Sequence, residues 1–188
     1  MKKLFVAACL FLCIRVYAQN AAQDSAFITY KDSINGVSFK YPAQWDSAEF
    51  NQLVKRGTSE FNGYFGAFIN SGFSKNEFST FFTFRDTTIS KSTSNEMILK
   101  NSKTSFRDSF PNAEILDSGI KLSKNDLKYI FMLVELPQNA TTTPIVMNIQ
   151  FIRGTHKDEF YFTCGTDEDY QNLKNYFQEV IDSFQFDK

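Results

Sequence analysis

The chain has 188 residues, a formal net charge of −1, and 43% hydrophobic residues, with 22 phenylalanines among them. A chain of this length buries about 70% of its unfolded surface when it folds, so it can form a stable core without disulfides. It lacks the clustered lysine and arginine that nucleic-acid binding by counterion release requires, so we expect no nucleic-acid partner.

The first 18 residues have the pattern of a secretory signal peptide. Lys2 and Lys3 precede an apolar run from Leu4 to Ile14, and a small-residue exit ends at Ala18. The apolar run has 11 residues, whereas a membrane-spanning helix needs about 20, so we expect no membrane span. We therefore predict cleavage near Ala18 and a periplasmic or extracellular location.

An alternative cleavage box at Val6–Cys9 would leave a lipid on Cys9. The apolar core before that box would be shorter than the about 7 to 15 residues of a usual signal, which argues against lipidation. Cleavage after Ala18 removes three positive charges, so the net charge falls from −1 to −4. It also leaves Cys164 as the single cysteine and keeps 20 of the 22 phenylalanines for the core.

Residues 19–26 are small and polar without periodicity, which is typical of a flexible leader. From residue 27 onward, no linker rich in proline, glycine or serine divides the chain, and no repeat recurs. We therefore expect a single domain over residues 27–188.

Asn35-Gly36 lies between two strand-like runs, at 27–34 and 37–41. It predicts a β-hairpin with a type I′ turn, in which both central residues need positive φ. Pro42 should end the second strand because it lacks a backbone N–H. Trp45 follows, and we expect it to pack at the edge of the core; the alternative is that it belongs to a ligand site.

A capping box at Asp46–Glu49 predicts a short helix over residues 47–56, and Gly57 suits its C-terminal stop. Two aromatic runs of strand length follow, at 64–70 and 78–85. Their phenylalanines are typical of buried strand faces. The alternative is that they line a pocket for an apolar small molecule.

A second capping box, Thr93–Glu96, predicts a helix that continues to about Phe110 and is closed by Pro111. Four runs of strand length follow. They span residues 113–122, 127–136, 144–153 and 158–164. Their short polar connections favour an antiparallel meander, because parallel neighbours need much longer crossovers. In the third run apolar residues alternate with Asn148 and Gln150, as in a strand with one buried face.

The segment Thr166–Asp169 places a hydroxyl cap and three acidic residues at the start of a last helix. Apolar residues then recur at steps of three and four, so one stripe of this helix should lie on the sheet. They are Tyr170, Leu173, Phe177, Val180, Ile181 and Phe184. The elements together predict an α+β fold with a mainly antiparallel sheet flanked by helices.

Three segments together resemble the PsbP-like domains of the Mog1/PsbP fold. They are YKDSINGVSFKYPAQW near the mature N-terminus, KNDLKYIFMLVEL in the meander and the closing YQNLKNYFQEVIDSFQF. The resemblance spans nearly the whole mature chain and implies an α/β/α sandwich with a non-catalytic accessory or partner-binding role. In that family the segment after the tryptophan runs fairly directly into a strand, so the helix expected here leaves the strand order around residues 58–85 open.

No catalytic group of residues stands out. His156, the single histidine, lies in the loop GTHKD between two expected strands, without a nucleophile motif nearby. Cys164 is in phase with Phe160 and Phe162 and should point into the core; the alternative is a reactive thiol at the start of the following helix. A pair of carboxylates that meet only in space leaves no sequence signature, so a hydrolase stays a third hypothesis.

The sequence also predicts no metal or cofactor. His156 and Cys164 lack the paired spacing of zinc sites, and Asp167, Glu168 and Asp169 lack the alternating ligands and the glycine of a calcium loop. The resulting hypothesis is an exported, non-enzymatic domain that binds a partner protein. The alternative is a carrier or sensor of an apolar small molecule.

Overall fold

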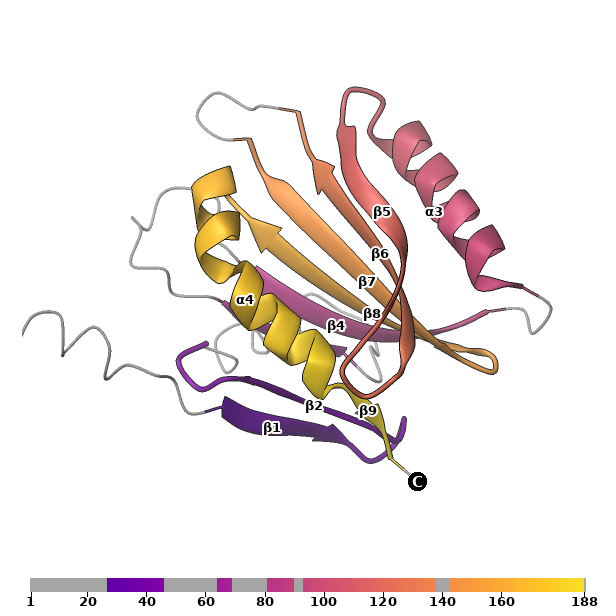
Figure 1. The fold of residues 1–188 in the computed structure, drawn as a ribbon, viewed down its shortest axis with the longest axis vertical. Helices are drawn as coiled ribbons and strands as arrows, with labels where there is room; N and C mark the ends of the chain where they lie inside the picture. Colours follow the sequence, from indigo (N-terminus) through magenta and orange to yellow (C-terminus); the bar gives the residue numbers. More distant parts are fainter. Residues whose placement is uncertain (1–26, 46–63, 69–80, 90–92, 138–142, 188) are drawn as a thin grey trace, which may run out of the picture.

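The computed structural model of the chain describes residues 27–45, 64–68, 81–89, 93–137 and 143–187. Within them, nine strands and two helices follow one another (Figure 1). They are β1 (Phe27–Asp32), β2 (Val37–Pro42), β3 (Tyr64–Phe68), β4 (Phe81–Thr88), α3 (Asn95–Ser109), β5 (Glu114–Leu122), β6 (Lys128–Glu135), β7 (Ile145–Arg153), β8 (His156–Cys164), α4 (Asp167–Ser183) and β9 (Gln185–Phe186). The expected signal peptide, leader and helix at 47–56 lie outside the described residues.

The larger sheet has six strands in the order β3-β4-β8-β7-β6-β5, and every neighbouring pair is antiparallel. Strands β5 to β8 form the predicted meander. β4 lies beside β8, with Phe81 opposite Thr163 and Thr88 opposite His156. This pairing answers the question of strand order around residues 58–85, because it places the β3–β4 pair at one edge of the sheet.

The smaller sheet has three strands in the order β1-β2-β9. β1 and β2 form the predicted hairpin, but the expected type I′ turn is wrong. Gly36 has a φ of 63°, whereas Asn35 has no positive φ, and four residues separate the strands. The carboxylate of Asp32 explains the difference, because its Oδ1 accepts hydrogen bonds from the backbone N–H groups of Ile34 and Asn35 at 2.9 and 3.1 Å.

β9 was not predicted from the sequence. It follows α4 directly and pairs with β2, with Phe186 opposite Val37. The hydroxyl of Ser38 donates to a carboxylate oxygen of Asp187 at 3.1 Å, which joins the same two segments. The first described strands and the last one are therefore side by side.

The two helices begin at side-chain caps. For α4 the cap is the predicted Thr166, whose Oγ1 accepts a hydrogen bond from the Asp169 N–H at 3.1 Å. For α3 the predicted cap Thr93 is wrong by one residue. Ser94 takes that place, because its Oγ accepts from the Met97 N–H at 3.2 Å, three residues on.

The hydrophobic core lies on one face of the six-stranded sheet, where α4 and the β1–β2 hairpin pack beside each other (Figure 1). Phe160 of β8 is fully buried at its centre. The ring centroids of Phe39, Phe84, Phe184 and Phe151 lie 5.1, 5.1, 5.4 and 6.0 Å from that of Phe160. Trp45 is buried against Phe177, which confirms its expected place at the core.

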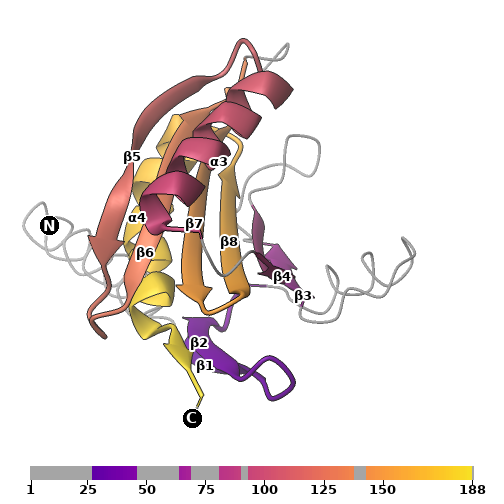
Figure 2. The same ribbon diagram turned by 90° about the vertical axis from the view of Figure 1, so that its right-hand side faces the viewer.

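The opposite face of the sheet is covered by α3, which packs against β5 and β6 (Figure 2). The two helices thus lie on opposite faces, as in the expected α/β/α arrangement. Ile98 is the only residue of α3 that is buried. Most of the helix surface therefore contributes little to the core.

Candidate functional site

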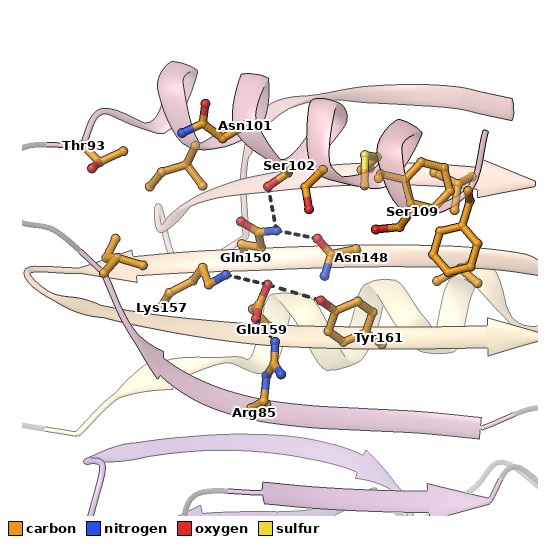
Figure 3. A pocket seen from close by; sticks show the side chains of 18 of the residues that line it. Arg85, Thr93, Asn101, Ser102, Ser109, Asn148, Gln150, Lys157, Glu159 and Tyr161 are labelled. Carbon is orange, nitrogen blue, oxygen red and sulfur yellow. Dashed lines mark hydrogen bonds and ion pairs between the residues drawn. The ribbon is translucent and has the colours of Figure 1, made fainter. Parts of the chain in front are cut away.

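A cleft of ≈ 740 Å³ lies between α3 and the six-stranded sheet (Figure 3). Its helix wall is the side of α3 that faces the sheet. Its floor is formed by side chains of β4, β8, β7 and β6 that point away from the phenylalanine core. We call this site the α3 cleft.

The charged part of the floor is centred on Glu159 of β8, whose side chain is only 2% exposed. One Glu159 carboxylate oxygen, Oε2, accepts a hydrogen bond from Arg85 Nη2 at 2.8 Å, and the other, Oε1, lies 3.0 Å from Lys157 Nζ. A buried carboxylate is costly unless cations and donors compensate its charge, so these two partners fix its position. The arrangement follows from strand register, because Arg85 is opposite Glu159 and Lys157 is two residues before it on the same face.

Tyr161 extends this cluster along β8. Its hydroxyl donates a hydrogen bond to Glu159 Oε1 at 3.4 Å. Burial of the phenol, together with the negative charge of Glu159, raises the pKa of Tyr161 to about 12. Tyr161 is therefore a neutral hydrogen-bonding group in the cleft throughout the physiological pH range.

The next part of the floor is formed by two amides of β7, Asn148 and Gln150, which are 4% and 3% exposed. The expectation of one buried face for β7 is therefore wrong, because α3 covers the side that was expected to face solvent. Gln150 Nε2 donates to Asn148 Oδ1 at 2.6 Å and to Ser102 Oγ of α3 at 3.3 Å. Asn148 Nδ2 in turn donates to the carbonyl oxygen of Phe160 at 3.4 Å.

The oxygen of the Gln150 amide has no such partner. Gln150 Oε1 is buried and accepts no hydrogen bond within the part of the chain that the structure describes. Exchanging the oxygen and nitrogen of the Gln150 amide would not solve this, because Asn148 Oδ1 would then lose the hydrogen bond that Gln150 Nε2 donates. An unsatisfied buried acceptor costs about 1–3 kcal/mol, so such a group in the floor of a cleft indicates a place for an incoming donor.

The cleft changes from charged to apolar along the strands. Arg85, Glu159 and Gln150 are directly opposite one another in one row across the sheet. Two residues further along lie Tyr161, Asn148 and Met132, and two residues beyond them lie Val146 and Val134. Phe106 of α3 and Phe110, the residue directly after it, line the same cleft, at the end of the helix that leads into β5.

The candidate residues that the sequence singled out lie elsewhere. His156 was expected in a loop, which is wrong: Gly154 and Thr155 form the turn, and His156 is the exposed first residue of β8. Cys164 is the last residue of that strand, about 26 Å away at 3.3 Å per residue. Asp167, Glu168 and Asp169 form the first turn of α4.

Cys164 is fully buried and faces the core, as predicted. Burial raises the pKa of its thiol to about 12, and the charge of Asp169 acts in the same direction. The thiolate is the reactive form of cysteine, so this thiol is chemically inert in the folded protein. Among the described residues, no group of three or more His, Cys, Asp or Glu side chains is placed to hold a metal ion.

We expect a thiol reagent to modify Cys164 of the native mature protein only as fast as the protein unfolds. The rate at pH 8 should rise with urea in parallel with the unfolded fraction, because reaction requires exposure of the thiol. Fully denatured protein supplies the control and should react rapidly at one thiol per chain. Rapid modification of the native protein without urea would contradict a core position.

The phenylalanines of the two aromatic runs do not form the α3 cleft. Phe84, the one whose side chain the structure describes, lies in the core on the other face of the sheet. The cleft residues that the sequence reading missed are polar side chains at alternate positions of otherwise apolar strands. Asn148, Gln150, Glu159 and Tyr161 all have this spacing. It indicates that the strands have a second, polar face, but it does not indicate that a helix covers this face.

No model of a known protein family matches the sequence, and no curated protein is similar to it in sequence. Solved structures do match. The solution structure of cyanobacterial PsbP from Synechocystis has a TM-score of 0.52 and 13% identity, over 86% of this chain and 93% of that chain. The crystal structure of the Saccharomyces cerevisiae Ran-binding protein Mog1p has a TM-score of 0.55 and 9% identity, over 87% and 96%.

A protein of unknown function from Pseudomonas aeruginosa, PA94, also matches, with a TM-score of 0.54 and 8% identity over 84% of this chain and 94% of that chain. These likenesses confirm the PsbP/Mog1-like α+β fold. At such low identity they show the fold alone, and function has to be argued from the site. Neither α3 nor α4, the helices that the structure describes, is long and apolar enough to cross a membrane.

Proposed function

We propose that the protein is an exported, non-enzymatic binding protein that holds a small molecule in the α3 cleft. The observation that carries this proposal is the buried Gln150 Oε1, which has no hydrogen-bond partner among the described residues and lies in the floor of a cleft of ≈ 740 Å³. Clefts that bind small molecules have volumes of about 300–1,000 Å³ and a few well-placed polar groups on apolar walls. The α3 cleft has both properties.

The positions of the potentially reactive residues support a binding role without catalysis. Cys164 is buried on the other face of the sheet from the cleft. His156 precedes Lys157 at the start of β8, so alternation along the strand directs it to the face opposite the cleft, and it is not among the described lining residues. Glu159, the one carboxylate among the described residues that line the cleft, is held by Arg85 and Lys157, and no second carboxylate of this lining lies beside it. Glycoside hydrolysis, the reaction weighed from the sequence, needs two carboxylates that flank the bond.

Export is supported by the charged start, apolar run and small-residue exit of residues 1–18. The mature chain would keep one cysteine, which is buried, so an oxidising compartment would form no internal disulfide in it. A periplasmic or extracellular carrier or sensor would meet its ligand in that compartment.

Mass spectrometry of the protein purified from its own cells tests both parts of the proposal. Under denaturing conditions we expect the mass of a chain that begins at Gln19, and under native conditions a stoichiometric adduct that is lost on unfolding. The variant Ser102→Trp should lose the adduct, because the indole fills the cleft from α3. The matched control Lys100→Trp carries the same side chain at an exposed position of α3 outside the cleft lining and should keep it.

A chain with residues 1–18 still attached would contradict export. Absence of an adduct from the wild-type protein, or equal adducts in the two tryptophan variants, would contradict binding in the cleft.

A protein partner is the second candidate. It is favoured by the likeness in fold to Mog1p, which is a Ran-binding protein, and by the accessory role that the PsbP-like resemblance implies. Cross-linking in the native cell, followed by identification of the co-purified proteins, tests this candidate. A specific partner recovered equally with wild type and with Ser102→Trp, together with an empty cleft, would favour it over the small molecule.

A further inference from the structure

We infer that the ligand of the α3 cleft is an amphipathic molecule with one negative charge at its head, a hydrogen-bond donor next to that head, and an apolar body. N-acyl amino acids have this chemistry. The inference rests on the proposed function and specifies its ligand class. Three properties of the cleft carry it: its net charge, the vacant acceptor and the order of its polar and apolar side chains.

The charge of the head follows from the charged side chains of the lining. Among the described residues of the lining, Arg85 and Lys157 are cationic, Glu159 is anionic, and the remaining side chains are uncharged. The described lining therefore carries one net positive charge, with Arg85 and Lys157 both beside the Glu159 carboxylate (Figure 3). Lys157 is 21% and Glu159 2% exposed as side chains, so water screens this charge only in part. A monoanion neutralises the cleft, whereas a dianion leaves an excess negative charge.

The hydrogen-bond donor of the ligand is inferred from the Gln150 side chain. Its Oε1 is vacant, while its Nε2 is used by Asn148 and Ser102. Gln150 is opposite Glu159 in the sheet register, so a donor that reaches Oε1 lies next to the charged cluster. The amide N–H of an acyl amino acid is separated from its carboxylate by one carbon, which suits two adjacent subsites.

The direction of the apolar body follows from the order of side chains along β7 and β6. Met132 lies opposite Asn148 in the floor, and Val134 and Val146 lie two residues beyond them. The α3 side of this part is lined by Phe106 and by Phe110, which is 46% exposed. The head of the ligand should therefore lie near the β7–β8 turn and its apolar end near Phe110.

The purely apolar ligand that the sequence suggested does not suit this site. It would cover Glu159, Asn148 and Gln150 without meeting the vacant acceptor or the net charge. Burial of polar groups without compensating hydrogen bonds is unfavourable. An amphipathic ligand displaces water from the apolar end of the cleft and forms hydrogen bonds with the polar side chains at the other end.

Three related probes separate these contributions by isothermal titration calorimetry on the mature protein, below the concentrations at which the probes form micelles. N-dodecanoylglycine has the charge, the donor and the chain. N-dodecanoylsarcosine lacks the amide N–H, and the methyl ester of N-dodecanoylglycine lacks the charge. We expect N-dodecanoylglycine to bind with one-to-one stoichiometry, and each of the other probes to bind about tenfold more weakly.

Two variants connect each preference with its residue. Lys157→Met removes the net positive charge, so the preference for the acid over its ester should vanish. Gln150→Met removes the vacant acceptor, so the preference for the glycine over the sarcosine derivative should vanish. Lys100→Met, on the exposed side of α3, is the matched control and should leave both preferences unchanged. Thermal unfolding followed by circular dichroism checks that each variant folds; if one does not, the comparison of probes on the wild-type protein still decides.

The outcomes distinguish this inference from the proposed function. Equal affinity for the three probes, or tighter binding of the ester, would overturn the inference and leave small-molecule binding intact. A native adduct identified as a neutral or polyanionic molecule would do the same. Absence of both probe binding and a native adduct would overturn the proposed function as well.

Discussion

Replacement of Phe160 by alanine should lower the free energy of unfolding by about 3–5 kcal/mol. Phe160 is fully buried, and four aromatic rings from β2, β4, β7 and the end of α4 surround it. Because those rings belong to elements that pack from different directions, no single neighbour can move to fill the space. The cavity should therefore persist, which is the condition for the large cost.

Urea denaturation followed by circular dichroism measures this effect. Leu122→Ala is a suitable control, because Leu122 is 59% exposed and surface changes shift stability by only about 0.5 kcal/mol. If Phe160→Ala does not fold, the milder Phe160→Leu should still unfold cooperatively with a loss of about 1 kcal/mol. Equal stability of wild type and Phe160→Ala would show that β8 does not carry the centre of the core.

Replacement of Glu159 by alanine should cost about 3 kcal/mol. This value is at the low end of the about 3–5 kcal/mol that is typical when one partner of a buried ion pair is removed. The loss arises because Arg85 and Lys157 remain close to each other without the carboxylate between them. It stays at the low end because the side chains of Arg85 and Lys157 are 41% and 21% exposed and can regain some hydration.

Glu179→Ala is the matched control for this variant. Glu179 forms an ion pair with Lys124 at 3.2 Å, with both side chains more than half exposed, and such surface pairs contribute about 0–1 kcal/mol. The two variants should be compared by urea denaturation at neutral pH and low salt. A cost for Glu159→Ala no larger than that for Glu179→Ala would mean that Glu159 is hydrated in the folded protein, against its burial in the cleft floor.

Features that depend on residues close in sequence were predicted well. The hairpin before Pro42, the meander of β5 to β8 and the cap of α4 at Thr166 all follow from turn chemistry, alternation and side-chain capping. The errors in these regions are small and local. Hydrogen bonds to the Asp32 carboxylate stabilise a different turn from the expected type I′ turn, and Ser94 rather than Thr93 caps α3.

Features that depend on distant segments were not predictable in this way. Nothing near β4 in sequence indicates that it pairs with β8, about 70 residues later, and β9 is too short to have a pattern of its own. The α3 cleft also depends on segments that are distant in sequence. Alternation shows that Asn148 and Gln150 share a face with each other, but not that a helix from residues 95–109 closes over that face. Sequence patterns therefore predicted the strands of the cleft floor and missed the cleft.

The pairing of β2 with β9 has a consequence for how the protein folds. Ser38 and Asp187, which are hydrogen-bonded, are 149 positions apart, so the smaller sheet can be completed only when both ends of this long segment are present. Contacts between residues so distant in sequence slow folding, because the entropy of closing the loop is lost before the contacts are gained. The N-terminal hairpin must therefore wait, incompletely packed, until β9 has been synthesised, which delays closure of the core until late in folding.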